Sequence, residues 1–428
     1  MKKVELENKR LTDGLIVPLL LCTAFSLFLF NESARSFLGN GILNTYFNIF
    51  FLLFGITLIV IFLIRQCLDL RIILLTFSFI GMALILLKLN GRNLLQQIVL
   101  MTSMGLPFLI TAIRIPEAIF KPLCEKFIKS INLICLLLML TALLDYMSGS
   151  AIQLFLAKHY FFDNDQINLV LSAHARGEYR YYSIVGHPLV VSWYFLAYYM
   201  LNILYNRYFK PISNEYVVTL VTLIGLVLCA SRTAIIIAVI MIIFLNNRTH
   251  KILYFILFSI FGLLGAINPI TKEVLIKRFM AGLSSSDYSG GRNSAFILVL
   301  KHYVDPPSWI MGGGLGYSRQ ITMMMGGFIN SFEYPMIMFA YDFSIIGAII
   351  IYLVIFVSPI YVFIKNKTFF FIPFFILISF YMNGFNVLAN YSDHMGQFCF
   401  IIMILVNFSY FIKSRCDGEM KNEKSNYI

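Results

Sequence analysis

Residues 216–247, YVVTLVTLIGLVLCASRTAIIIAVIMIIFLNN, are two apolar runs separated by a single charged residue, Arg232. Almost no polar sequence is left for a loop between the runs. A chain in lipid must satisfy its backbone hydrogen bonds internally, so each run is expected to be helical. The stretch therefore predicts two membrane helices joined by a tight turn, with Arg232 at the turn.

The rest of the chain repeats this apolar pattern. Of its 428 residues, 59% are hydrophobic and 13% are charged, and a membrane helix needs about 20 apolar residues. The sequence predicts an all-α polytopic membrane protein with about twelve transmembrane helices, forming one integral membrane domain over residues 1–428. The predicted spans are 13–30, 43–64, 72–89, 97–113, 128–146, 188–205, 216–231, 233–247, 252–268, 344–364, 369–387 and 397–412.

The basic residues set the predicted orientation. Short cytoplasmic loops are enriched in Lys and Arg, and placing both termini in the cytoplasm puts most of the 33 Lys and Arg residues on that side. The tail 413–428 is then cytoplasmic. The net charge of +12 reflects this topology, so we predict no binding to nucleic acid. The first apolar run is expected to be a retained span, because further spans follow it.

Two connections are too long to be simple turns. Residues 147–187 and 269–343 both fall on the outer side of the predicted topology, and their many aromatic and aliphatic residues argue against disorder. We expect both loops to fold as caps over the outer mouth of the bundle. Neither loop contains a cysteine, so the sequence indicates no disulfide framework and no cysteine metal site.

Arginines are the main candidates for chemistry. Arg232, at the depth of lipid headgroups, suits a phosphate group, although an arginine there can also simply mark a helix end. Arg292 lies in SGGR, 289–292, before a predicted helix whose N-terminus attracts anions. The long loops add further candidates, each of which can also be an ordinary solvated charge: Arg176, Arg180 and Arg278.

Few acidic residues lie near the outer face. Glu333 precedes a predicted helix and is a candidate general base or an ion-pair partner for a loop arginine. Asp342 follows nine residues later, which places it on a different helix face. His187 begins a span and can be a helix cap, a core residue or a ligand-binding group. The glycines of GGGLG, 312–316, follow no predicted strand, so a dinucleotide site is not expected.

Together these segments resemble the O-antigen polymerase and O-antigen ligase superfamily of bacterial inner membranes, over about residues 180–350. The motifs that carry the resemblance, in chain order, are GHP at 186–188, Ser231-Arg232-Thr233, SGGR at 289–292, Gly314-Leu315-Gly316, and the set Glu333, Asp342 and Gly347. In ligases, a histidine occupies the position of Glu333.

The resemblance implies a glycosyltransferase at the periplasmic face of the inner membrane. The donor would be an undecaprenyl-diphosphate-linked glycan, the acceptor a hydroxyl group, and the reaction would need no metal or other cofactor. Arg232 and Arg292 would stabilise the leaving diphosphate and Glu333 would be the base. Expected partners are the lipid-linked glycan, membrane lipids and, as an open alternative, a chain-length regulator. The substrate-binding set would be Arg176, Arg180, Arg278, His187, Asp342, Gly314 and Gly316.

The resemblance leaves three functions open. Glu333 in place of the histidine favours a polymerase, which joins repeat units of O-antigen or a related surface polysaccharide. The first alternative is a ligase that transfers finished polymer to lipid A core. The second is a transporter of lipid-linked sugars, which would need charged residues along its spans. Tyr181, Tyr182, Tyr288, Trp309 and Tyr317 could stack on sugar rings or belong to the hydrophobic core.

Overall fold

The computed structural model describes the chain in nine ranges. These are 2–38, 48–91, 93–161, 164–177, 179–245, 292–302, 304–325, 334–389 and 393–425. Regular structure within them is helical, apart from one isolated antiparallel bridge between Leu68 and Ile113. The prediction of an all-α chain is confirmed for this part of the protein.

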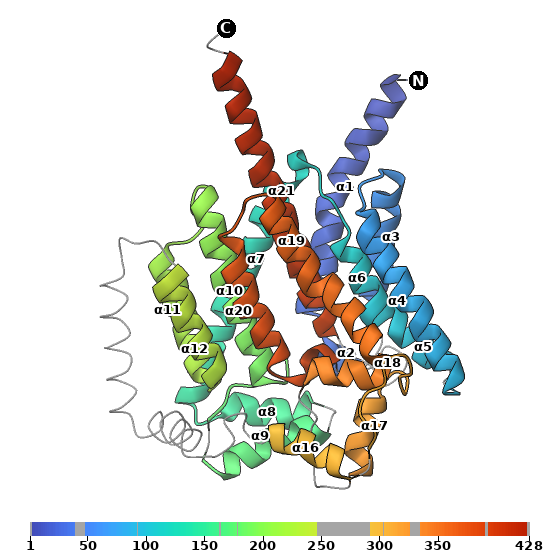
Figure 1. Ribbon diagram of the computed structural model, residues 1–428. Coiled ribbons are helices and arrows are strands. Elements are labelled where there is room, and N and C mark those ends of the chain that lie inside the picture. The colour runs from blue at the N-terminus through green and yellow to red at the C-terminus, as the bar shows by residue number, and fades with distance from the viewer. Residues whose placement is uncertain are drawn as a thin grey trace.

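Long helices form the bundle and shorter ones lie at one end of it (Figure 1). The bundle contains α1 (Lys2–Phe28), α3 (Ile49–Ile64), α4 (Leu70–Leu89), α5 (Leu94–Leu100), η1 (Met101–Gly105), α6 (Leu106–Thr111), α7 (Glu117–Met147), α10 (Pro188–Tyr208), α11 (Glu215–Leu228), α12 (Arg232–Ile240), η2 (Met241–Leu245), α18 (Pro335–Tyr352), η5 (Leu353–Val357), α19 (Ser358–Lys365), α20 (Phe371–Asn383) and α21 (Asp393–Ser425). The shorter elements are α2 (Glu32–Leu38), α8 (Ala151–His159), α9 (Asn164–Ala175), α16 (Arg292–Lys301), α17 (Tyr317–Met324) and η6 (Asn386–Ala389).

The helices agree with most of the predicted membrane segments. Six helical segments in the described ranges are long and apolar enough to cross a membrane, and five more apolar helices are shorter. The predicted span at 252–268 lies outside the described residues. The structure thus supports a membrane protein with multiple helical spans, and the number twelve stays a prediction.

Both termini lie at one end of the bundle, which we call the terminal end (Figure 1). The opposite end, which we call the loop end, carries α2, α8, α9, α16 and α17. Of these, α8, α9, α16 and α17 come from the two long loops predicted to be caps. The helices of the bundle alternate in direction between the two ends, so the starts of α10, α12, α18 and α21 all reach the loop end.

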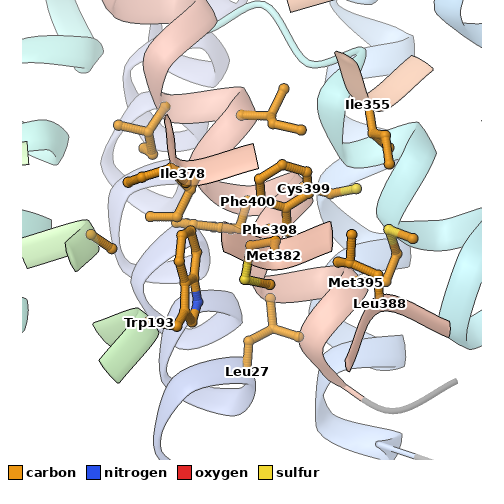
Figure 2. Packing of buried hydrophobic residues seen from close by; sticks show 14 of the residues in the cluster. Leu27, Trp193, Ile355, Ile378, Met382, Leu388, Met395, Phe398, Cys399 and Phe400 are labelled. Atoms are coloured by element: carbon orange, nitrogen blue, oxygen red, sulfur yellow. The ribbon is translucent and has the colours of Figure 1, made fainter. Parts of the chain in front are cut away.

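Two helices form the centre of the bundle. In their most apolar 18 residues, α10 is 94% buried and α21 is 89% buried, against 39% for α4 and α7. Figure 2 shows the packing between them, where Trp193 of α10 meets Phe398 of α21 edge to face, with ring centroids 6.0 Å apart. Since the outer helices expose large apolar side chains such as Leu74 and Leu144, they are suited to face lipid.

Helix α18 is broken near the loop end. Ser344 has φ of 75° and ψ of 167°, which is not helical, so the apolar run predicted to begin at 344 is preceded by a separate helical piece. The backbone of 308–314 fills the break: Gly313 N donates to Tyr341 O (2.9 Å) and Ile345 N donates to Ser308 O (2.9 Å). Non-helical backbone inside a membrane needs hydrogen-bond partners for its N–H and C=O groups, and these contacts supply them.

Candidate functional site

The turn between α11 and α12 presents Arg232 at the loop end. Helix α11 ends at Leu228, and Ala230 takes a positive φ of 52° before Ser231 and Arg232 begin α12. A non-glycine residue in this region is uncommon and costs roughly 1–2 kcal/mol. Within the described residues 216–245, the two apolar runs therefore form the predicted hairpin, with Arg232 at its tip.

The segment that carries Arg180 is paired with the end of α11. Tyr181 N donates to Leu228 O at 3.0 Å, which brings the loop from residue 179 onwards next to the hairpin tip. Arg180 and Arg232 lie close enough for their positive charges to repel each other. The structure thus brings together two arginines that are 52 residues apart in the sequence. Both belong to the predicted substrate site.

A buried tyrosine holds this arrangement together. The Tyr381 hydroxyl, from α20, donates to Leu189 O of α10 at 2.9 Å and lies 3.4 Å from the Ser231 hydroxyl. The electrostatic effect of Arg180 also reaches Tyr381. One phenol therefore connects α20, the start of α10 and the residue before Arg232.

Arg176 belongs to the same neighbourhood. Burial raises the pKa of Tyr182, and the positive charges of Arg180 and Arg176 oppose that rise. Arg176 follows α9 and is exposed, whereas Arg180 is half-buried and its Nε lacks a hydrogen-bond partner. We call Arg176, Arg180 and Arg232 the arginine cluster. A cluster of like charges is relieved by a bound anion, and guanidinium groups match the geometry of phosphate.

His187 caps the N-terminus of α10. Its Nδ1 accepts a hydrogen bond from Leu189 N at 3.3 Å, as the N-cap of α10, and Pro188 takes the first helical position. Gly186 has φ of 81°, and a Cβ there would lie 2.8 Å from the Ser33 hydroxyl. The GHP step therefore starts α10 against α2, which fits the helix-cap alternative for His187.

Asp342, Gly314 and Gly316 meet at the break in α18. The Asp342 carboxylate is fully buried and accepts hydrogen bonds from Ser318 N (2.6 Å) and Gly316 N (3.4 Å), at the N-terminus of α17. Gly314 N donates to the backbone oxygen of Asp342 at 2.9 Å. Both glycines have positive φ, 84° and 77°. Asp342 therefore caps α17 and positions it against α18.

Several predicted site residues fall outside the described part. Glu333, Arg278 and the side chain of Arg292 are among them. The helix predicted after SGGR is confirmed, because α16 begins at Arg292. The prediction that Tyr181 and Tyr182 could stack on sugars is not supported, since both are only 3% exposed. Trp309 is 66% exposed, so its ring remains accessible for stacking on a sugar.

Three buried charged residues at the loop end were not predicted. Arg35 Nη1 lies 2.6 Å from Asp393 Oδ2, with side chains 1% and 5% exposed, and Asn48 Nδ2 donates to the other Asp393 oxygen at 2.9 Å. Asp145, near the end of α7, is fully buried. A carboxylate inside a predicted span was the available sequence signal for Asp145. No group of three or more His, Cys, Asp or Glu side chains that could hold a metal ion occurs in the described ranges.

Comparison with known proteins gives no relative from which a function can be transferred. No family model matches the chain, and neither the curated proteins nor the solved structures contain a significant match. The function therefore has to be argued from the residues and their geometry.

Proposed function

We propose that this protein is a membrane glycosyltransferase that polymerises undecaprenyl-diphosphate-linked oligosaccharide repeat units into O-antigen or a related surface polysaccharide. In this proposal the loop end faces the periplasm of a bacterial inner membrane and both termini are cytoplasmic. The observation that carries the proposal is the hydrogen bond from Tyr181 N to Leu228 O at 3.0 Å, which places the segment bearing Arg180 beside the hairpin tip bearing Arg232.

The arginine cluster suits a lipid diphosphate. Such a molecule has an apolar tail, which the lipid-facing helices accommodate, and a headgroup with several negative charges. Arg232 begins a membrane helix, and Arg180 approaches it from the loop side. An anion bound between them would replace mutual repulsion by attraction, in a region partly shielded from water where electrostatic interactions are stronger.

The same cluster can promote the chemical step. When the glycan is transferred to a hydroxyl group, negative charge develops on the departing diphosphate. Positively charged groups that are already in place stabilise that charge without reorganisation. Tyr381 and the Tyr181–Leu228 backbone hydrogen bond keep the two arginines in place. In this mechanism no metal ion is needed to neutralise the leaving group.

The acceptor hydroxyl needs a proton acceptor, and we assign that role to Glu333. It precedes α18, whose first residue, Pro335, lies at the loop end with the arginine cluster. Asp342 is a poor alternative, because its two oxygens accept backbone hydrogen bonds from α17. A ligase would use a histidine at the position of Glu333, so the glutamate favours the polymerase.

The distribution of buried charge argues against a transporter of lipid-linked sugars. A transport path of this kind is expected to carry charged groups through the thickness of the membrane. The buried carboxylates in the described ranges are Asp145, Asp342 and Asp393. Asp145 lies near the end of α7, Asp342 at the break of α18 and Asp393 at the start of α21, all toward the loop end.

The test is the pattern of surface lipopolysaccharide from a strain lacking this gene. A polymerase predicts core carrying a single repeat unit with no ladder of longer chains. Bare core with polymer accumulating on undecaprenyl diphosphate would instead indicate the ligase, and an unchanged ladder would overturn both.

Variants of the arginine cluster then test the site. Arg180→Ala and Arg232→Ala should each abolish long polymer, because each removes a charge-assisted contact worth about 1.5–3 kcal/mol. The matched control is Arg207→Ala, at the terminal end, where the guanidinium lies over the Phe370 ring at 3.7 Å. Membrane insertion should be equal in all three, and full-length polymer in both cluster variants would contradict the diphosphate site.

A further inference from the structure

A chain of buried hydrogen bonds links the end of α7 to the segment that carries Arg180. Gln153 of α8 donates from Nε2 to Asp145 Oδ2 at 2.6 Å, and its backbone N donates to Asp145 Oδ1 at 2.9 Å. The Gln153 Oε1 in turn accepts from Tyr182 N at 2.9 Å. Asp145 is fully buried and Gln153 is 3% exposed. We call Asp145 and Gln153 the carboxylate–amide clamp.

The chemistry of the clamp fixes its direction. An ionised carboxylate only accepts hydrogen bonds, whereas a glutamine amide donates at one end and accepts at the other. Asp145 therefore orients the Gln153 amide with Nε2 toward itself and Oε1 toward Tyr182. Only this orientation gives the Tyr182 N–H an acceptor.

Two consecutive backbone hydrogen bonds hold the segment that directly follows Arg180. Tyr181 N is bound to Leu228 O at the end of α11, and Tyr182 N is bound to the clamp. Arg180 directly precedes these two residues. It lines a small pocket with Gln153 and Tyr182, together with Ser150 and His174. The clamp thus lies next to Arg180.

A charged group is a costly choice for this position. Burying a carboxylate costs several kcal/mol unless it is paired and hydrogen-bonded. The charge of Asp145 is felt by its neighbours: burial and the negative charge of Asp145 both raise the pKa of Tyr179. What the carboxylate provides, and a neutral amide does not, is a group that accepts at both oxygens and so determines the direction of the chain of hydrogen bonds.

We propose that Asp145 and Gln153 are positioning residues that hold Arg180 toward Arg232 for diphosphate binding. This inference rests on the proposed function, since it concerns the same anionic substrate group. The clamp acts on Tyr182, and through the backbone on Arg180.

Directionality makes the proposal testable by two single replacements and their combination. In Asp145→Asn, one oxygen remains to accept from two donors, the Gln153 backbone N and Gln153 Nε2, so one of these hydrogen bonds is lost unless the Gln153 amide turns and gives up its contact with Tyr182 N. In Gln153→Glu, two carboxylates face each other. In the double variant, the introduced asparagine amide donates to one oxygen of the introduced glutamate, and the other glutamate oxygen accepts from Tyr182 N. Every hydrogen bond of the clamp is then restored with the same number of atoms.

The measurement is the equilibrium binding of undecaprenyl diphosphate to the purified full-length protein in detergent, together with its melting temperature. Each single replacement should weaken binding by about tenfold or more, the equivalent of one lost hydrogen bond to a charged group. The double variant should return to within about threefold of the wild type. If one of the single replacements does not fold, Gln153→Met takes its place, because it removes the amide without opposing like groups. It should show the same loss of affinity.

A matched control separates positioning from general stability. Asn202→Ala removes a buried amide of α10 that bonds Asn132 and Tyr198 O toward the terminal end. It should lower the melting temperature and leave affinity unchanged. Wild-type affinity in the folded single variants, or no recovery in a folded double variant, overturns the positioning role alone. No binding of undecaprenyl diphosphate by the wild type overturns the proposed function and, with it, this inference.

Discussion

Charged residues are arranged differently at the two ends of the bundle. At the terminal end, Arg114 pairs with Asp69 at 2.7 Å with side chains 20% and 23% exposed, and Lys129 pairs with Glu125 at 2.6 Å with both well exposed. At the loop end, the Arg35–Asp393 pair is almost completely buried. Also at the loop end, Arg180 lies close enough to Arg232 for the two positive charges to repel each other.

The two ends differ in how much their charged residues destabilise the folded state. The exposed Lys129–Glu125 pair contributes little to stability, and both side chains of the Arg114–Asp69 pair still reach solvent. Buried charges and like charges in proximity destabilise the fold unless other groups compensate. Their concentration at the loop end supports the proposal that a ligand binds there, and three experiments probe the contrast.

The largest effect is expected for the buried pair. Arg35→Ala leaves the Asp393 carboxylate buried without its cation and should destabilise the protein by about 3–5 kcal/mol. Arg114→Ala removes a pair at the terminal end whose side chains are 20% and 23% exposed, and it should cost less than Arg35→Ala because solvent can compensate Asp69. Thermal denaturation of both variants in detergent compares them directly.

The buried pair also allows a compensated variant. Replacing both partners by apolar residues, Arg35→Met with Asp393→Leu, removes the uncompensated charge, and Asn48 Nδ2 keeps its bond to Ser26 O at 2.8 Å. The double variant should be more stable than Arg35→Ala. Equal losses for Arg35→Ala and Arg114→Ala would remove the distinction between the two ends.

An intermediate effect is expected at the break of α18. A Cβ on Gly312 would lie 2.4 Å from the backbone oxygen of Asp342 and 2.7 Å from Ser344 N. Since backbone atoms cannot move aside as a side chain can, Gly312→Ala should cost about 1–3 kcal/mol. Gly81→Ala is the control, because a Cβ there has no neighbour within 4 Å. A melting temperature for Gly312→Ala equal to that of Gly81→Ala would show that 308–314 does not pack into the break.

The smallest effect is expected on the terminal surface. Lys129 and Glu125 are one helical turn apart on α7, with side chains 58% and 38% exposed. Lys129→Ala should leave both the melting temperature and the polymer ladder unchanged within error, since solvent screens the pair. A marked loss of either would mean that the terminal end also takes part in function.

Much of the fold could be predicted from the sequence. Apolar runs marked the membrane helices, and the tight turn at Arg232 and the helix after SGGR are both present. The break in α18 was only partly visible: the apolar run begins at 344, but the helical piece 335–343 before it carries Asp342 and was not separated by composition. The φ of 75° at Ser344 depends on the glycine segment 308–314, which is distant in the sequence.

The sequence indicated which types of residue form the candidate site, but it did not indicate most of the contacts between them. The grouping of Arg180 with Arg232 is present in the structure, and of the two alternatives for Tyr181 and Tyr182, sugar stacking or core packing, burial favours the core. Asp145 lies near the end of a predicted span, and its role depends on its partner, Gln153 of the next helix, which the sequence does not identify. Arg35 and Asp393 are 358 residues apart, and nothing local to either one indicates the other.

The sequence by itself determined that the chain is helical and apolar enough for a membrane, and that its two long loops contain several arginines. Both properties depend only on local composition. The transfer free energy of an apolar segment and the net charge of a loop are each the sum of contributions from their own residues. Only the tertiary structure decided which charges are buried, which are paired and which repel, because these depend on contacts between segments far apart in the chain. The direction of the Asp145–Gln153–Tyr182 hydrogen bonds is such a property, since it exists only when α7, α8 and the loop before α10 are packed together.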